Sequence, residues 1–203
     1  ALEPMTERVA CKACGESIVQ STADANEGLC VPCKRGYRHR IEEGKRRREE
    51  EKRYRESPAW KHWLHLVEKA TPPDGFSRLS APEQRFFAVR VLIGEVYNGG
   101  FDQYFYNSAA DTYVQALEGL QELGLTDSLR ILRAAKEAMF GADRVVPDTE
   151  SRRALLRMKA TTPAAKPVQQ TLDRLDKEFW ADPDKLDELL EEYANNHRLR
   201  AGF

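Results

Sequence analysis

Apolar residues recur at helical spacing once the chain passes residue 57. Trp60, Trp63 and Val67 lie three or four positions apart, which is typical of the buried face of an amphipathic helix. The pair Ser57-Pro58 precedes them. Serine caps a first turn and proline fits the position after it, so this pair is typical of a helix N-terminus. The pattern therefore predicts a helix that begins at residue 58.

The next helix is the most apolar part of the chain. Ser80, Pro82 and Glu83 precede it and match a capping motif, in which the serine and the glutamate satisfy free N–H groups of the first turn. We expect this helix to occupy the centre of the core. Its apolar residues are Phe86, Phe87, Val89, Val91, Leu92, Ile93 and Val96.

Helical patterns separated by turn residues continue to the end of the chain. Neither a βαβ alternation nor a run of strands with a period of two interrupts them. The fold class predicted for residues 58–203 is therefore mainly α, a compact multi-helix domain. The remaining helices are expected around residues 111–123, 126–140, 149–159, 168–180 and 183–200.

A charged segment, residues 37–57, precedes this domain. It is rich in Arg, Glu and Lys, which favour helices, and opposite charges lie three or four residues apart, as in Glu42 with Arg46 and Glu49 with Arg53. It has almost no apolar stripe, so solvent would surround the whole helix. The sequence predicts a charged connector helix.

Four cysteines precede the charged segment with the spacing C-x2-C-x15-C-x2-C. A tight turn brings each pair of sulfurs to one side, and two such turns complete a tetrahedral shell of four thiolates. Such a shell leaves no position for an activated water. The spacing predicts one structural zinc ion (Zn2+) per chain in a module of residues 1–36. Its ligands would be Cys11, Cys14, Cys30 and Cys33.

The cysteines could instead form disulfides or a redox pair. Two disulfides require an oxidising compartment, but the N-terminus has no apolar segment typical of a secretory signal. A redox pair of the thioredoxin kind would lie in a βαβ unit, and no such pattern surrounds either pair. We expect a short strand, a polar turn at residues 24–28 and a return between the pairs. A charged helix directly after the second pair resembles the treble-clef finger, so the module is predicted as zinc-ribbon or treble-clef-like.

Charge is uneven along the chain, although the net charge is only -1. Residues 34–56 hold eleven Lys or Arg against six Glu. This bias favours an alternative function, a zinc-finger regulator that binds nucleic acid through segment 34–55. The glutamates weaken it, because phosphates would also meet carboxylates, and a solvated connector remains the other interpretation. The phosphate-binding candidates are Arg38, Arg40, Lys45, Arg46, Arg47 and Arg48.

The central apolar helix runs into an aromatic-rich motif, NGGFDQYFYNS, at residues 98–108. Its two glycines allow a sharp turn, which predicts that the apolar helix ends there in a left-handed cap. Phe101, Tyr104 and Phe105 have the spacing to be buried on one helical face. The motif is then either a rigid turn between helices or a groove for a ligand or partner. The groove would be lined by Tyr97, Asp102, Gln103, Tyr106 and Asn107.

This motif, with the apolar helix before it, resembles the hallmark of a bacterial domain family named for a DNA-mimic protein. The resemblance implies a compact all-helical domain over residues 58–203. It also implies a protein partner, because the named member is similar to an acidic dimer that occupies the DNA-binding surface of a transcription factor. A homodimer is therefore a candidate assembly. The matching positions are Asn98, Gly99, Gly100, Phe101, Gln103, Tyr104, Phe105 and Asn107.

The resemblance has two departures. A DNA mimic presents carboxylates at phosphate-like intervals, yet residues 58–203 hold 19 basic and 22 acidic residues. The cysteine module and its basic helix are also additions to the family pattern. The one strongly acidic stretch is residues 172–192, with nine Asp or Glu against three Lys or Arg. Partner-binding candidates from this stretch are Asp184, Asp187, Glu188 and Glu191.

Sequence patterns of catalysis are missing from the chain. His62 and His65 have a spacing that could share a metal, but no carboxylate cluster accompanies them, and no phosphate-binding or dinucleotide motif occurs. No apolar run approaches the roughly 18 to 20 residues that cross a bilayer. We therefore expect a cytoplasmic, non-enzymatic interaction or regulatory protein.

Overall fold

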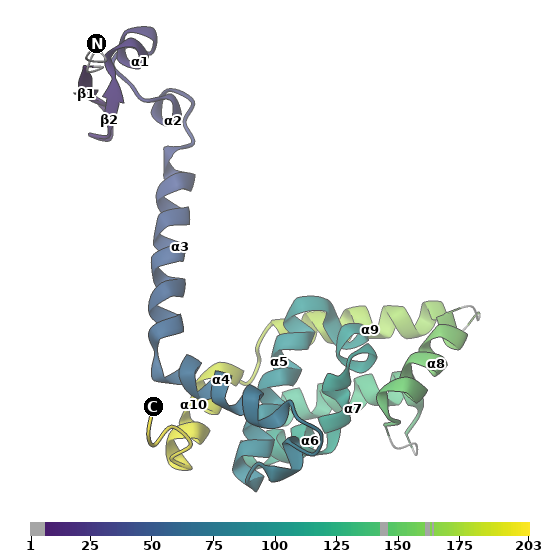
Figure 1. Cartoon of the computed structure of the whole chain (residues 1–203). Helices are drawn as coiled ribbons and strands as arrows, with labels where there is room; N and C mark the ends of the chain where they lie inside the picture. The colour runs from purple at the N-terminus through teal and green to yellow at the C-terminus, as the bar shows by residue number, and fades with distance from the viewer. Residues whose placement is uncertain (1–6, 143–145, 161–162, 164) are drawn as a thin grey trace. The chain divides into compact units, whose positions relative to one another are not determined.

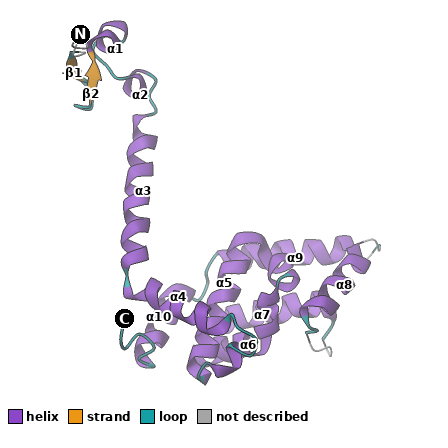
Figure 2. Cartoon of the chain, in the orientation of Figure 1, coloured by secondary structure: helices purple, strands orange, loops and turns teal. Residues whose placement is uncertain are grey.

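The computed structural model describes residues 7–142, 146–160, 163 and 165–203 of the chain, and these residues are mainly helical, as the sequence predicts (Figures 1 and 2). The chain divides into two compact units, residues 1–60 and residues 61–203. Each is described by itself. The first six residues of the predicted zinc module lie outside the described part.

The N-terminal unit begins with a small antiparallel hairpin. Strand β1 (Arg8–Ala10) pairs with β2 (Ser17–Val19), and Val9 lies opposite Ile18. The chain then forms a short helix, α1 (Gln20–Ala25), rather than running straight into the polar turn expected at residues 24–28. The helix buries Ala23, which a fully polar turn would leave exposed.

Two further helices complete this unit. Helix α2 (Val31–Lys34) is a single turn with proline near its start. Helix α3 (Arg38–Glu56) follows after Gly36, whose φ of 71° reverses the chain direction at little steric cost. No residue of α3 is buried, as expected for a helix whose sequence is polar on every face.

The helical unit takes in most of α4 (Pro58–Ala70), which starts where the sequence predicts. The Ser57 hydroxyl accepts a hydrogen bond from the backbone N–H of Trp60 at 3.2 Å. A short 3-10 turn, η1 (Phe76–Arg78), leads to the long helix α5 (Ala81–Tyr106). At its start the Glu83 carboxylate accepts the backbone N–H of Ser80 at 2.7 Å, which confirms the predicted capping pair.

Helix α5 is the centre of the helical unit and contacts α6, α8, α9 and α10 (Figure 1). A second 3-10 turn, η2 (Ser108–Thr112), joins α5 to α6. The helices after it are α6 (Tyr113–Glu122), α7 (Thr126–Phe140), α8 (Thr149–Ala160), α9 (Ala165–Trp180) and α10 (Leu186–Asn196).

The apolar helix is interrupted at its glycine pair, as the sequence predicts, but the interruption is not a left-handed cap. Helix α5 is kinked there and continues to Tyr106. Gly99 has φ -157° and ψ 23°, and Gly100 has φ 73° and ψ -174°, so two residues leave the helical conformation before it resumes. The predicted cap is therefore an internal kink, because Phe101, Tyr104 and Phe105 bury their side chains and hold a second helical stretch in the core.

Among the described residues, no helix is both long and apolar enough to cross a membrane.

Candidate functional site

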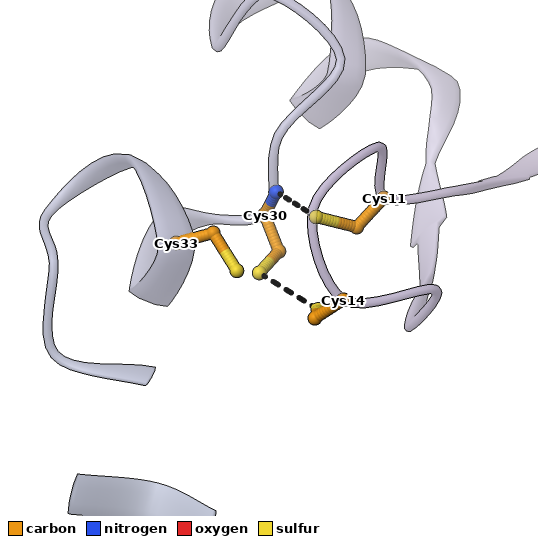
Figure 3. A group of neighbouring side chains, drawn as sticks. All are labelled: Cys11, Cys14, Cys30 and Cys33. Carbon is orange, nitrogen blue, oxygen red and sulfur yellow. Dashed lines mark hydrogen bonds between the residues drawn. The ribbon is translucent and has the colours of Figure 1, made fainter. Parts of the chain in front are cut away.

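The four cysteines meet at one point of the N-terminal unit (Figure 3). Cys11 and Cys14 lie in the turn between β1 and β2, while Cys30 caps α2 and Cys33 lies inside it. All four Sγ atoms lie within 4.8 Å of one another, and none is in a disulfide. Four bonds of about 2.3 Å to a tetrahedral zinc would separate the sulfurs by about 3.8 Å. The 3.7 Å between the sulfurs of Cys14 and Cys30 fits that shell.

Backbone hydrogen bonds hold the two cysteine turns together. The N–H of Cys30 donates to the Sγ of Cys11 at 3.2 Å, and the N–H of Lys12 donates to the carbonyl of Gly28 at 3.0 Å. Gly15 and Gly28 both have positive φ, as tight turns beside a metal ligand commonly require. These hydrogen bonds and turns bring the two cysteine pairs together.

The thiols of the cluster do not ionise alike. The hydrogen bond from the Cys30 backbone lowers the pKa of Cys11 to about 6, because it stabilises the thiolate. The hydrogen bond with the Cys30 side chain, together with burial, raises the pKa of Cys33 to about 12. The Cys11 thiolate therefore forms readily, and that of Cys33 needs a cation to share its charge. A divalent metal ion is the group that this donor set suits.

The basic residues of α3 are largely occupied by neighbouring glutamates. Arg38 makes ion pairs with Glu16 and Glu42, both at 2.7 Å. Lys45 lies 3.4 Å from Glu42, so this glutamate meets Arg38 and Lys45 rather than the expected Arg46. Arg38 and Lys45 are thus paired with carboxylates.

Two of the four remaining candidates of this helix also lie near glutamates. Arg46 lies 3.8 Å from Glu50, and Arg47 lies 2.5 Å from Glu43. Arg48 donates to the carbonyl of Gly44 in its own helix at 3.1 Å. Arg40 is exposed on the first turn of α3. Nucleic-acid binding through this segment stays a prediction.

The kink of α5 frees backbone groups, and α9 satisfies two of them. In an uninterrupted helix the Phe101 N–H would donate to the carbonyl four residues earlier. Here it donates to the Asp176 carboxylate at 2.8 Å. The indole of Trp180 donates to the carbonyl of Val96, also at 2.8 Å. Burial raises the pKa of Asp176, because it disfavours the charged form of the carboxyl group. The hydrogen bond to the kink is therefore made by a carboxylate whose burial is unfavourable.

The carbonyl end of α5 is closed by a buried arginine from α8. Arg152 is 0% exposed, and its guanidinium donates to the carbonyls of Phe105 at 2.9 Å and Asn107 at 2.7 Å. It also pairs with Asp111 at 2.6 Å. A cation at the negative end of a helix is stabilising, and here its hydrogen bonds satisfy the last carbonyls as well. Sequence patterns gave no sign of this residue.

Three polar residues bridge the two halves of α5. The Oε2 atom of Glu95, before the kink, accepts from Gln103 at 2.7 Å and from Asn107 at 2.8 Å, both after the kink. Two of the predicted partner-binding residues, Gln103 and Asn107, therefore donate hydrogen bonds to the Glu95 carboxylate. Glu95 lies one turn before the glycines, which is the only signal that could have singled it out.

A groove of about 520 Å³ lies beside this carboxylate, and we call it the kink groove. Of the partner-binding candidates, Tyr97, Gln103 and Asp187 line it. Asp102 instead accepts a hydrogen bond from Gln169, and Tyr106 lies under the guanidinium of Arg153 at 4.9 Å. The residues lining the groove are Trp63, Arg90, Val91, Ile93, Gly94, Glu95, Tyr97, Asn98, Gln103 and Asp187.

Two acidic candidates of the C-terminal stretch have structural partners. Asp184 accepts the backbone N–H of Ser128 at 2.7 Å, close to the N-terminus of α7. Asp187 lies 2.7 Å from Arg90, so it joins α10 to α5. These contacts use part of the negative charge that the sequence assigns to partner binding.

The other two acidic candidates lie on α10. Glu188 is strongly exposed, and its pair with Lys185 at 3.4 Å is loose. Glu191 forms a closer pair with Arg200, with two contacts of 2.5 and 2.7 Å. Glu192 is exposed next to it. Exposed carboxylates thus remain along one edge of α10.

The two histidines of α4 do not form a metal site with other residues. The cysteine cluster is the one group of metal-binding side chains found in the described part of the chain. His62 is 1% exposed, and its ring packs against those of Phe86 and Phe203 at 5.3 and 5.5 Å between centroids. Burial lowers its pKa. Its surroundings are those of a core side chain.

Comparison with known proteins agrees with the motif. A family model described as DMP19-like protein matches residues 77–197, which include the kink, all of α10 and the residues that line the groove other than Trp63. No curated protein and no solved structure matches the chain significantly.

Proposed function

Because this chain belongs to the DMP19-like protein family, we propose that its helical unit is a non-enzymatic, regulatory domain that binds another protein. The family match carries this proposal, since it covers the central helix, the motif and the acidic stretch together. The contacts made by the residues of the motif at 98–108 also support this proposal. Three of their aromatic side chains, those of Phe101, Tyr104 and Phe105, fill the core, and two of their amides hold Glu95. These contacts suit a rigid surface rather than a set of reacting groups.

The partner is a DNA-binding protein, and the chain would bind it as a DNA mimic. The exposed edge of α10, with Glu188 and Glu192, supplies carboxylates for this contact. Exposed like charges attract a basic DNA-binding surface over distances of about 10 Å at 0.1 M salt. The paired acids Asp187 and Glu191 strengthen the helix packing behind this edge.

The cysteine cluster holds one structural Zn2+ in this proposal. The sulfur separations and the four-thiolate donor set support zinc, which prefers tetrahedral sulfur ligands. The ion would stabilise the N-terminal unit and would have no catalytic role. A reducing cytoplasm would keep the four thiols free to bind it.

Affinity capture from the native host tests the partner. The full chain serves as bait, and mass spectrometry identifies what is retained. The double variant Glu188→Gln/Glu192→Gln should retain clearly less partner than the wild type. The matched control Glu68→Gln/Glu137→Gln removes the same charge from other exposed positions and should behave like the wild type. Equal recovery by both variants would contradict a role for the α10 edge.

A further inference from the structure

We propose that the kink groove binds an arginine side chain of the partner protein. This inference rests on the proposed function and names the contact it would make. The groove combines a fixed carboxylate with aromatic side chains in a volume of about 520 Å³, within the range of about 300 to 1,000 Å³ typical of ligand pockets.

The carboxylate of Glu95 is the first reason. It is half-buried, and the neutral amides of Gln103 and Asn107 both bind the same oxygen, Oε2. Within the described chain, no lysine, arginine or histidine forms an ion pair with it. Two neutral donors orient a charge without neutralising it, and a partly desolvated charge gains most from a cation that reaches it.

Aromatic residues are the second reason. Trp63 and Tyr97 both line the groove, and Tyr97 is 47% exposed although it is a large ring. The Trp63 ring stacks on Phe87 at 5.3 Å, and the Tyr97 ring meets Phe179 edge-on at 6.1 Å, so the core fixes both rings. Fixed rings beside a carboxylate favour a guanidinium, which stacks on rings and is weakly hydrated.

The charge balance of the groove is the third reason. Its charged lining residues are Arg90, Glu95 and Asp187, which sum to -1. Arg90 pairs with Asp187, and this pair already joins an arginine to a carboxylate on one side of the groove. Burial and the carboxylates of Asp182 and Asp187 raise the pKa of Tyr97, so negative charge surrounds its hydroxyl as well. An incoming cation therefore fits the field better than an anion.

Arginine is favoured over lysine because of geometry. A guanidinium can donate two parallel hydrogen bonds to a carboxylate while its flat face lies on a ring, whereas an ammonium is a compact, strongly hydrated charge. The side-chain amide of Gln103 orients the Glu95 carboxylate through a hydrogen bond to Oε2.

The test uses small probes and the full chain. N-acetyl-arginine methylamide is titrated into labelled protein, and amide shifts in residues 91–103 are followed by NMR. We expect saturable shifts there, none with the neutral citrulline analogue, and weaker ones with the lysine analogue. Glu95→Gln should bind the probe about tenfold more weakly, and the control Glu137→Gln should bind it normally. Equal shifts from arginine and citrulline, or none from arginine, would overturn the proposal.

A folding defect in Glu95→Gln is distinguished by a second variant. Tyr97→Leu removes an exposed ring and leaves the Glu95 bridge intact, so its spectrum should remain native while its probe affinity falls. Unchanged affinity in Tyr97→Leu would contradict the aromatic part of the proposal. If the wild-type chain captures its partner but does not bind the arginine probe, only this inference is contradicted. If the wild-type chain binds the probe but captures no partner, the proposed function is contradicted.

Discussion

Gly100 determines the geometry of the motif at the residue scale. Its φ of 73° with ψ of -174° lies in a region that residues with a Cβ rarely adopt. A Cβ there would also lie 2.3 Å from the Asp176 carboxylate, which holds the next backbone N–H. The glycine is therefore required both by its conformation and by the close approach of α9.

Replacing Gly100 with alanine should strongly destabilise the helical unit. The conformational cost and the clash with Asp176 together predict a loss of about 2–4 kcal/mol in the free energy of unfolding. Gly94→Ala is the matched control, since Gly94 is exposed in the same helix and a Cβ there meets nothing within 4 Å. It should stabilise by up to about 1 kcal/mol. Urea unfolding followed by circular dichroism measures both, and equal stability of the two variants would contradict this account of the kink.

His62 makes the helical unit sensitive to acid. Burial lowers its pKa below the usual 6.5, so the unfolded chain binds the proton first as the pH falls. Its stabilising contribution is complete above pH 6.5 and is lost as the pH falls from there towards the lower folded pKa. Glu83, Glu191, Arg200 and His65 are the charged groups that act on it.

The variant His62→Phe should weaken this pH dependence. Phenylalanine fits between the rings of Phe86 and Phe203 and binds no proton. Urea midpoints measured at pH 7.5 and pH 5.5 should differ less in the variant than in the wild type. His65→Gln, at an exposed position on the same helix, should keep the wild-type difference. An unchanged difference in His62→Phe would show that other groups cause the acid sensitivity.

At the scale of elements, the spacing of apolar residues predicted where the helices lie. It did not predict features that depend on contacts with other helices. The Ser80–Glu83 cap and the burial of Phe101, Tyr104 and Phe105 follow from local pattern, and the structure confirms them. The geometry of the kink at the glycines of α5 could not be predicted, because it depends on Asp176 from a distant helix. Helix α1 was missed since a six-residue polar helix has no recognisable period.

The candidate site shows the same division. Four cysteines close together in sequence predicted their own cluster, because local turns suffice to form it. Glu95 and Arg152 could not be chosen from the sequence, since their roles arise from hydrogen bonds across 8 to 47 residues of chain. A groove assembled from α4, α5 and α10 has no sequence signature of its own.

Zinc removal tests the N-terminal unit as an element. We expect about one zinc per chain by mass spectrometry of the metal, and its loss in Cys30→Ser, because one ligand of four is gone. The hairpin and α1–α2 should then lose order in NMR spectra. Signals of residues 61–203 should stay unchanged, since the helical unit has its own core. Full metal content in Cys30→Ser would contradict the four-cysteine site.

At the scale of the whole molecule, opposite charges are concentrated in different units. The basic helix α3 belongs to the N-terminal unit, and the acidic stretch belongs to the helical unit. In α3, glutamates neutralise much of the positive charge at intervals of three or four residues. On α10, three acids also have basic partners, and Glu192 is exposed. The proposed contact with a basic protein surface would use the exposed carboxylates of Glu188 and Glu192 in the helical unit.

Competition with DNA tests this central claim most directly. The full chain is bound to the purified partner at fixed concentration, and the DNA duplex that the partner recognises is added in increasing amounts. The account predicts that the fraction of chain released rises with the fraction of partner that is occupied by DNA. It also predicts that the chain without its partner binds no duplex, even at low salt. A complex that persists when the partner is saturated with DNA would contradict the proposed function.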